Sequence, residues 1–196
     1  MNSGSRGRPR TIDTDVVALQ ALDLFEAHSF DEVTMDDVAA ASGVSRRSLF
    51  RLFPTKGSIL LHGFDEFTDR LREALDSSMP IQPIALVLEE AFGTAAEMTP
   101  TTLDTLRRMH QVIASQGISS GGVGRRRLLT VQVAEFLSAR RGTTPRSDFQ
   151  NAVLSHVTAA AAVTAIDWWA LNAVDQLVPV MKDAIRLTVG EPANQH

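Results

Sequence analysis

Cysteine is absent from the sequence, and lysine is almost absent. Without cysteine the chain has no disulfide bond, no thiolate nucleophile and no cysteine-based zinc site. Of its 19 basic residues only Lys56 and Lys182 are lysine. This bias alone indicates no function, because genome composition produces it as readily as a need for guanidinium groups does. Covalent cysteine chemistry is therefore excluded.

Long apolar runs and a positive net charge are also lacking. Hydrophobic residues make up 44% of the chain and charged residues 21%, and no apolar run approaches the ~20 residues that span a bilayer. The formal net charge of -4 argues against indiscriminate coating of nucleic acid, although an acidic total leaves room for local basic surfaces. No hydrophobic segment of a secretory signal follows the N-terminal arginines. We therefore expect a cytoplasmic protein with no membrane partner.

Three short helices are predicted before Pro54 from the spacing of apolar residues and from side chains that accept the first amide protons of a helix. These capping residues are Asp13 or Thr14 for the first helix, Thr34 with Asp37 for the second, and Ser45 for the third. Gly43 supplies the turn between the second and third helices, because glycine adopts a positive φ at little cost. Three helices of this length predict a compact unit of the helix-turn-helix kind.

The rest of the chain also has helical periodicity, and nothing in it alternates like a strand. One amphipathic helix is expected to run from Thr55 to the break at Met79 and Pro80. Further helices are predicted at 83–97, 101–115, 124–140, 147–171 and 174–189. The glycine-rich stretch 117–124 is expected to be a loop, because it does not lie between a strand and a helix as phosphate-binding glycine loops do.

The predicted fold class is therefore all-α, with a helix-turn-helix unit followed by a larger helical domain. Three segments are expected. They are a flexible basic arm at 1–10, a DNA-binding domain at 11–56, and a ligand-binding and dimerisation domain at 57–196.

Residues 35–53 place each residue type where a helix-turn-helix needs it, with small apolar residues between the helices and arginines on the second one. The residues expected to contact DNA here are Thr34, Ser45, Arg46, Arg47, Ser48, Phe50, Arg51 and Lys56. No acidic residue lies between Ser45 and Lys56, so positive charge is concentrated on the element expected to meet DNA. The alternative for an isolated arginine pair is a solvated basic face.

The stretch TMDDVAAASGVSRRSLFRLFPTKGSIL, with the helix before it, resembles the DNA-binding domain of TetR-type regulators across residues 11–62. The resemblance implies that 45–52 is the recognition helix, that Lys56 contacts phosphate, and that a homodimer grips operator DNA until an effector releases it. The family usually has tyrosine where Phe50 stands and often an aromatic residue or histidine where Leu52 stands. Phe50 has no hydroxyl to donate to phosphate, but its ring can pack or touch a thymine methyl.

The N-terminal arm offers a second DNA contact through Arg6, Arg8 and Arg10. An extended arginine-proline-glycine segment can enter a narrow A·T-rich minor groove, and this one resembles the short core of an AT-hook. A disordered tail is the alternative.

Past residue 62 the segments FDEFTDRLREAL, LRRMHQVI and RRRLLTVQVAEFLSARRG, with the alanine-rich helix ending at Trp168 and Trp169, resemble actinobacterial regulators with an acyl-CoA-like ligand domain, the mycofactocin-associated ones in particular. The resemblance implies a hydrophobic effector such as a long-chain acyl-CoA, and no cofactor. An apolar tunnel for the acyl chain would be lined by Phe64, Phe67, Leu71, Leu106, Met109, His110, Ile113, Val133, Phe136 and Leu137. A coenzyme A phosphate would favour Arg107, Arg125, Arg126 and Arg127. Core packing and a solvated helix start are the alternatives.

The last two helices carry more apolar surface than one helix pair needs, which predicts an intermolecular four-helix bundle. The residues expected in this interface are Ala159, Ala162, Ile166, Trp168, Trp169, Leu177 and Val178. An ordinary monomeric core is the alternative.

Two other classes of protein stay open. A small helical enzyme acting on acyl thioesters could use His110 or His156 as a base, but no nucleophile motif accompanies either residue, and we expect no catalytic residues. No two histidines have the spacing of a metal pair, so no metal site is expected. A DNA-architectural protein without an effector would need fewer helices. A one-component repressor is the leading prediction.

Overall fold

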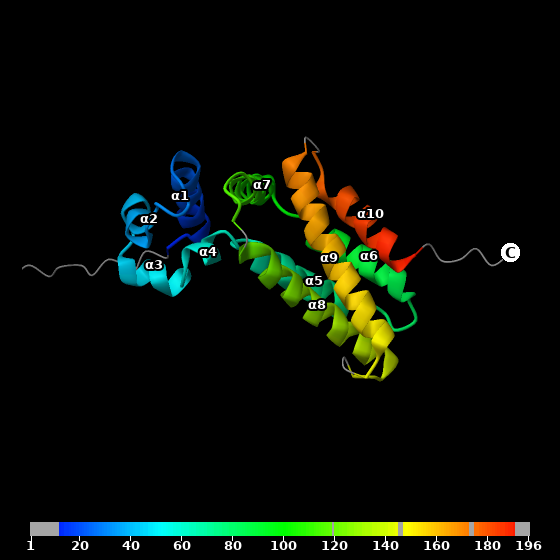
Figure 1. Cartoon of the computed structure of the whole chain (residues 1–196). Coiled ribbons are helices and arrows are strands. Elements are labelled where there is room, and N and C mark those ends of the chain that lie inside the picture. The colour runs from blue at the N-terminus through cyan, green and yellow to red at the C-terminus, as the bar shows by residue number, and fades with distance from the viewer. Residues whose placement is uncertain (1–11, 119, 145–146, 173–174, 191–196) are drawn as a thin grey trace, which may run out of the picture. The chain divides into compact units, whose positions relative to one another are not determined.

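The structure is a computed structural model that describes residues 12–118, 120–144, 147–172 and 175–190 (Figure 1). Within these ranges the chain is helical and contains no strand, which confirms the all-α prediction. The chain divides into two compact units, Met1–Ile59 and Leu60–His196. The predicted arm, with Arg6, Arg8 and Arg10, lies outside the described residues.

The first unit holds a helix-turn-helix with side-chain caps at its helix starts. Its helices are α1 (Thr14–Ala27), α2 (Met35–Ala41), α3 (Arg46–Leu52) and α4 (Lys56–Ile59). Asp13 rather than Thr14 caps α1, and Ser45 caps α3 by accepting from the Ser48 amide over 3.1 Å. Gly43 has φ +61° in the turn before α3. These predicted helix starts are confirmed.

The cap of α2 is reciprocal. The Thr34 hydroxyl accepts from the Asp37 amide over 3.2 Å, while the Asp37 carboxylate accepts from the Thr34 amide over 2.8 Å. Hydrogen bonds from the Thr34 side chain and backbone lower the pKa of Asp37. The helices then bury one small core, made of Val17, Ala18, Ala21, Leu22, Phe25, Val33, Val38, Ala39, Leu49, Phe53 and Ile59.

The second unit is built around one long helix. Its elements are α5 (Phe64–Asp76), α6 (Ile84–Ala95), α7 (Pro100–Ser115), α8 (Ser120–Arg141), α9 (Phe149–Leu171) and α10 (Leu177–Val189). Helix α9 packs against α7, α8 and α10, and α6 packs against α5 and α10 (Figure 1). The core therefore lies between α9 and the helices that surround it.

Two predicted boundaries were wrong. The single helix expected from Thr55 is interrupted before Phe64, where Gly63 adopts φ +83°, because apolar spacing continues across the turn and hides it. The loop expected at 117–124 ends early, since α8 begins at Ser120. Glycine weakens a helix by about 1 kcal/mol per residue, but burial of the following turns, including Leu129, offsets that cost.

Helix α9 also departs from the expectation that no segment could span a bilayer. An 18-residue window of α9 is long and apolar enough to do so by length and composition, and 39% of that window is buried. Its alanines, valines and isoleucine raise the average hydropathy, although polar residues interrupt the apolar run. Because α7, α8 and α10 pack against it, α9 is the core helix of this unit.

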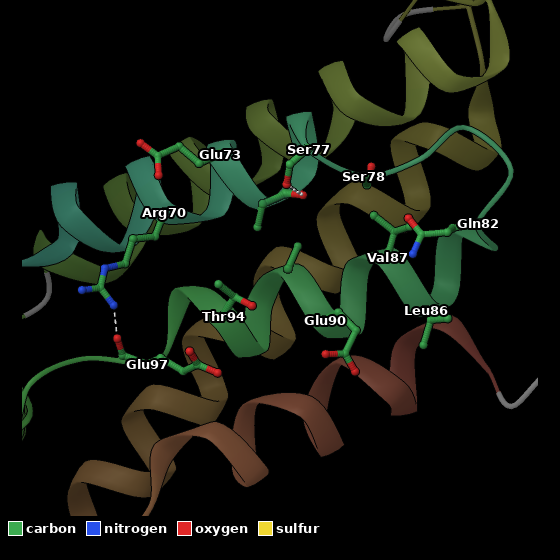
Figure 2. A pocket seen from close by; sticks show the side chains of 12 residues that line it. Arg70, Glu73, Ser77, Ser78, Gln82, Leu86, Val87, Glu90, Thr94 and Glu97 are labelled. Carbon is green, nitrogen blue, oxygen red and sulfur yellow. Dashed lines mark hydrogen bonds between the residues drawn. The ribbon is translucent and has the colours of Figure 1, made fainter.

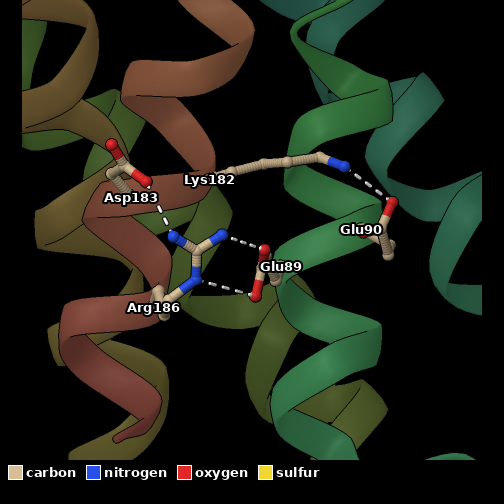
Figure 3. A network of polar contacts seen from close by, with 5 residues as sticks. All are labelled: Glu89, Glu90, Lys182, Asp183 and Arg186. Atoms are coloured by element: carbon tan, nitrogen blue, oxygen red, sulfur yellow. Dashed lines mark hydrogen bonds and ion pairs between the residues drawn. The ribbon is translucent and has the colours of Figure 1, made fainter. Parts of the chain in front are cut away.

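Ion pairs connect α6 to α10 at the edge of the core (Figure 3). Arg186 pairs with Glu89 at 2.5 Å and with Asp183 at 2.8 Å, and these carboxylates raise its pKa, with the Glu89 hydrogen bond as the largest cause. Lys182 reaches Glu90 over 2.8 Å by lying across Gly93, where a Cβ would collide with the lysine side chain. The missing side chain at Gly93 thus leaves room for the Lys182 side chain to cross α6.

Replacing Thr34 with alanine should destabilise α2, because the Asp37 amide loses its acceptor. A lost N-cap costs about 1 kcal/mol. Hydrogen exchange of the α2 amides in the full chain measures this cost directly, with Thr14→Ala as the control because Thr14 does not cap α1. Equal losses of protection in the two variants would contradict the assigned caps.

Candidate nucleic-acid interface and effector domain

Helix α3 presents arginines to solvent. Arg46, Arg47 and Arg51 are exposed, and Phe50 is 38% exposed beside them. The opposite face of α3 buries Leu49 in the core of the unit. The hydroxyls of the predicted contacts Ser45 and Ser48 lie 2.9 Å apart at the helix start. The arginines predicted to contact DNA therefore lie on the accessible side of α3, as binding in a major groove requires.

Arg46 also contacts a residue that sequence reasoning missed. Its Nη1 donates to Asp36 Oδ2 over 3.1 Å, its Nε lies 3.1 Å from Asp36 Oδ1, and its Cζ lies 5.5 Å from the centroid of the Phe50 ring. The two partners come from α2 and α3, ten residues apart, so neither helical spacing nor motif order signals the pair. An exposed pair of this kind adds about 0–1 kcal/mol to stability.

Two other predicted DNA contacts are engaged inside the unit. Lys56 Nζ donates to the Phe30 carbonyl over 2.6 Å and to the Asp31 carbonyl over 3.2 Å, and lies 4.7 Å from the Phe30 ring centroid. Thr34 is occupied as the cap of α2. Both residues therefore have structural roles before any DNA is bound.

Most of the residues predicted to line an acyl tunnel are buried in the core of the second unit, where they pack without an open tunnel among them. Those that are buried are Phe64, Phe67, Leu71, Leu106, Met109, His110, Val133 and Leu137. Phe67 packs against Phe64 and Phe92, with ring centroids 5.9 and 6.3 Å apart. Ile113 and Phe136 are partly buried. An acyl chain would have to separate helices to reach this set.

One cleft, of about 700 Å³, lies between α5 and α6 (Figure 2). Its residues are Arg70, Glu73, Ala74, Ser77, Ser78, Gln82, Leu86, Val87, Glu90, Ala91, Thr94 and Glu97. Arg70 donates to the Glu97 carbonyl and pairs with Glu66 at 2.9 Å. Polar side chains rim the cleft, and none of the predicted tunnel residues lines it.

A second cleft, of about 600 Å³, lies between α5 and α8. It is lined by Arg72, Leu75, Asp76, Ser78, Pro80, Gln132, Glu135, Phe136, Ala139 and Arg140. Arg140 lies 5.2 Å from the Phe136 ring centroid and donates over 2.7 Å to the carbonyls of Met79 and Pro80. Arg140 therefore ties the connection after α5 to α8, and Phe136 is shared with the predicted tunnel.

A polar chain links α7, α8 and α9, with His110 and Arg125 buried and the Asp167 side chain 47% exposed. Arg125 Nη1 donates to His110 Nε2 over 2.6 Å, and His110 Nδ1 lies 2.7 Å from Asp167 Oδ1. Because Nε2 accepts, Nδ1 carries the proton and donates it to Asp167. Burial lowers the pKa of His110, the Arg125 charge lowers it further, and the Asp167 hydrogen bond opposes both. Burial also lowers the pKa of Arg125.

The arginine run predicted as a phosphate site is therefore divided. Arg125 is 3% exposed and engaged with His110, whereas Arg126 and Arg127 are exposed on α8. Arg107 lies with its Cζ 4.5 Å from the Trp169 ring centroid. Helical rotation separates three consecutive residues, so they cannot all face one ligand.

The residues predicted for the dimer interface mostly face the core of a single chain instead. Buried in this core are Ala159, Ala162, Ile166, Trp169 and Leu177, while Val178 is partly buried and Trp168 is 50% exposed. The five buried residues cannot be offered to a second copy without unfolding the unit. Helix α9 has apolar residues on two faces, and sequence alone does not say which face the chain itself buries.

The apolar residues that α9 leaves exposed form a stripe. They are Phe149, Val153, Val157, Trp168 and Leu171, and we call them the α9 stripe. Their separations of four, four, eleven and three residues keep them on one face of the helix.

The His110 chain predicts a pH-dependent stability. Because the pKa of His110 is lowered in the folded state, the unfolded chain binds an extra proton once pH falls below about 6.5. The free energy of unfolding should therefore decrease as pH falls from about 7.5 to about 5.5, by at most about 1.4 kcal/mol per pH unit from this group. Urea unfolding at several pH values gives the free energy of unfolding of wild type and of His110→Gln as a function of pH. The contribution of His110 is the difference between these two pH dependences. Equal pH dependences would contradict it.

Two family models match this chain, one near its N-terminus and one over its C-terminal half. Residues 19–68 match the model of the bacterial regulatory proteins of the tetR family, and residues 82–191 match that of the MftR C-terminal domain. The Mycobacterium tuberculosis protein named mycofactocin biosynthesis transcriptional regulator MftR is 26% identical over 166 residues, covering 83% of this chain and 82% of that protein. The HTH-type transcriptional regulator EthR of Mycolicibacterium smegmatis is 34% identical over 80 residues, which are 39% of this chain and 37% of that one.

Solved structures share the fold. Thermus thermophilus FadR, a TetR-family repressor in complex with lauroyl-CoA, has a TM-score of 0.57 at 24% identity, covering 94% of this chain and all of that one. A TetR-family regulator from Streptomyces coelicolor has a TM-score of 0.54 at 18% identity, covering 89% and 78%. The family and these relatives are transcriptional regulators, not enzymes. The alternative hypothesis of an enzyme that acts on acyl thioesters is therefore wrong. The chain belongs to the TetR family of DNA-binding transcriptional regulators and carries an MftR C-terminal domain.

Proposed function

We propose that the chain is a homodimeric repressor that leaves its operator when a long-chain acyl-CoA binds the second unit. The observation that supports operator binding is the exposed arginine face of α3. Arg46, Arg47 and Arg51 lie on this helix, which contains no acidic residue. Two copies of this face reading two half-sites would give specificity that one copy lacks.

The α9 stripe supports the dimer. Trp168 is 50% exposed and Phe149 82% exposed in the single chain, and large apolar side chains in water are unfavourable by about 25 cal/mol per Å² of exposed surface. A second copy packed along the same face would cover them in a self-complementary interface. Leu187 on α10 is a further exposed apolar side chain, at 87%.

Replacing Val157 and Trp168 together with glutamate should give a monomer, because two charges in each copy would lose water inside the interface. Sedimentation equilibrium reports the mass. Val131→Glu is the matched control, since Val131 is 46% exposed on α8 and lies outside the stripe. An unchanged dimer in the double variant, or a monomer in the control, would place the interface elsewhere.

The effector proposal is supported by the resemblance to regulators of the MftR type and by the lauroyl-CoA bound to Thermus thermophilus FadR. The acyl chain would enter at the cleft between α5 and α8, where Phe136 and Leu75 border the closed core of Leu71 and Val133. Opening that core would shift α5 relative to α8. Such a ligand changes operator affinity only as far as it binds the two states unequally.

Palmitoyl-CoA should therefore bind, measured by calorimetry, and should lower operator affinity in a DNA-shift assay. Free coenzyme A should bind weakly if the acyl chain supplies most of the affinity, and palmitate should bind weakly if the head group does. Replacing the exposed Arg126 and Arg127 with alanine tests the head-group site without touching the buried Arg125. Palmitoyl-CoA that binds without changing operator affinity would refute the effector role and favour an architectural protein.

A further inference from the structure

Asp36 has a location that the cap and the core do not explain. The capping carboxylate of α2 is the neighbouring Asp37, and Asp36 itself is exposed. Its partner Arg46 belongs to the helix that should meet DNA, where a carboxylate repels the phosphates. A carboxylate in the first turn of α2 is favoured by the helix dipole, and Asp37 already supplies one. The exposed ion pair adds little to stability, so what distinguishes Asp36 is its contact with Arg46.

The geometry keeps Arg46 in place and still leaves it able to read a base. Asp36 holds Nη1 and Nε at 3.1 Å, and the guanidinium lies against Phe50 at 5.5 Å. The contacts with Asp36 occupy at most two of the five guanidinium N–H donors, one on Nη1 and the one on Nε. The remaining donors are enough for a two-bond contact with guanine O6 and N7, and the Arg46 side chain is 68% exposed.

We propose that Asp36 is a positioning residue that directs Arg46 toward a guanine edge and keeps it from binding phosphate. An arginine that is already held loses less rotamer entropy when it binds a base. A phosphate contact carries no sequence information, so a guanidinium drawn away from phosphates favours the operator over random DNA. The proposal rests on the assignment of α3 as the reading helix.

The first step of the test finds a DNA sequence for the full chain. Selection from a duplex library with a randomised centre gives the sequence that wild type prefers. Fluorescence anisotropy then gives the dissociation constants for this selected duplex and for a scrambled duplex of the same composition, and their ratio is the specificity.

Asp36→Ala should lower this ratio by up to about fivefold, the factor that corresponds to the most an exposed ion pair contributes. Two changes produce the loss: weaker binding to the selected duplex and tighter binding to the scrambled one. The salt slope of scrambled-duplex binding should steepen by up to about one, because Arg46 becomes able to neutralise a phosphate. Asp36→Asn, which keeps an acceptor for Arg46, should retain part of the ratio.

A double-mutant cycle separates positioning from simple charge removal. In the Arg46→Ala background, Asp36→Ala should leave the ratio unchanged, because the residue through which Asp36 acts is gone. Glu32→Ala is the control for the lost charge, since Glu32 is an exposed carboxylate of the same unit. It should change affinity for both duplexes alike, and urea unfolding should show all variants folded.

The outcomes distinguish the positioning role of Asp36 from the assignment of α3 as the reading helix, on which it rests. If wild type selects no sequence, the reading role of α3 fails and Asp36 loses its function with it. If wild type selects a sequence but Asp36→Ala keeps the full ratio, or lowers it equally without Arg46, only the positioning role is overturned. A reduced ratio that depends on Arg46 supports it.

Discussion

Helix α9 is the element on which the second unit depends, because it is apolar on two faces and only one can be covered by the chain. The covered face packs against α7, α8 and α10 and buries Ala159, Ala162 and Trp169. The small alanines let neighbouring backbones come close, as a tightly packed helix pair requires. The face left over, the α9 stripe, is then the natural place for a second copy. One helix thus links the protomer core to the proposed assembly.

Arginine serves several different purposes in this lysine-poor chain. Arg140 ties the connection after α5 to α8, Arg186 clasps α6 to α10, and Arg125 is buried against His110. Each joins two different elements of the unit, which suits a planar group with several donors. The arginines of α3 remain exposed, and Arg46 is held by Asp36, a carboxylate from α2. Its surroundings, not the residue type, decide whether an arginine is structural or available.

The first unit positions α3, the proposed reading helix, through local interactions. Asp13, Thr34 and Ser45 satisfy the free amides at the starts of three short helices, and Gly43 allows the turn before α3. Helices of seven residues are not stable alone, so these caps and the buried Leu49 together hold α3 in place. Lys56 adds a contact to the Phe30 carbonyl. Exposed arginines on so short a helix therefore depend on neighbouring residues for their orientation.

Local chemistry made the caps, the turn at Gly43 and the helix-turn-helix predictable from the sequence, because each depends on residues three or four positions apart. Helical periodicity also predicted the larger helical domain, and the family resemblance added the ligand expected for it. Tertiary structure decided what periodicity cannot express: that Gly63 interrupts a helix, that Ala159 and Trp169 face their own core, and that Arg125 turns inward while Arg126 turns out. It also brought Asp36 to Arg46 and His110 between Arg125 and Asp167. When a helix has apolar residues on more than one face, the packing of neighbouring helices decides which face is buried. The same packing decides which side chains from different helices come within hydrogen-bond distance.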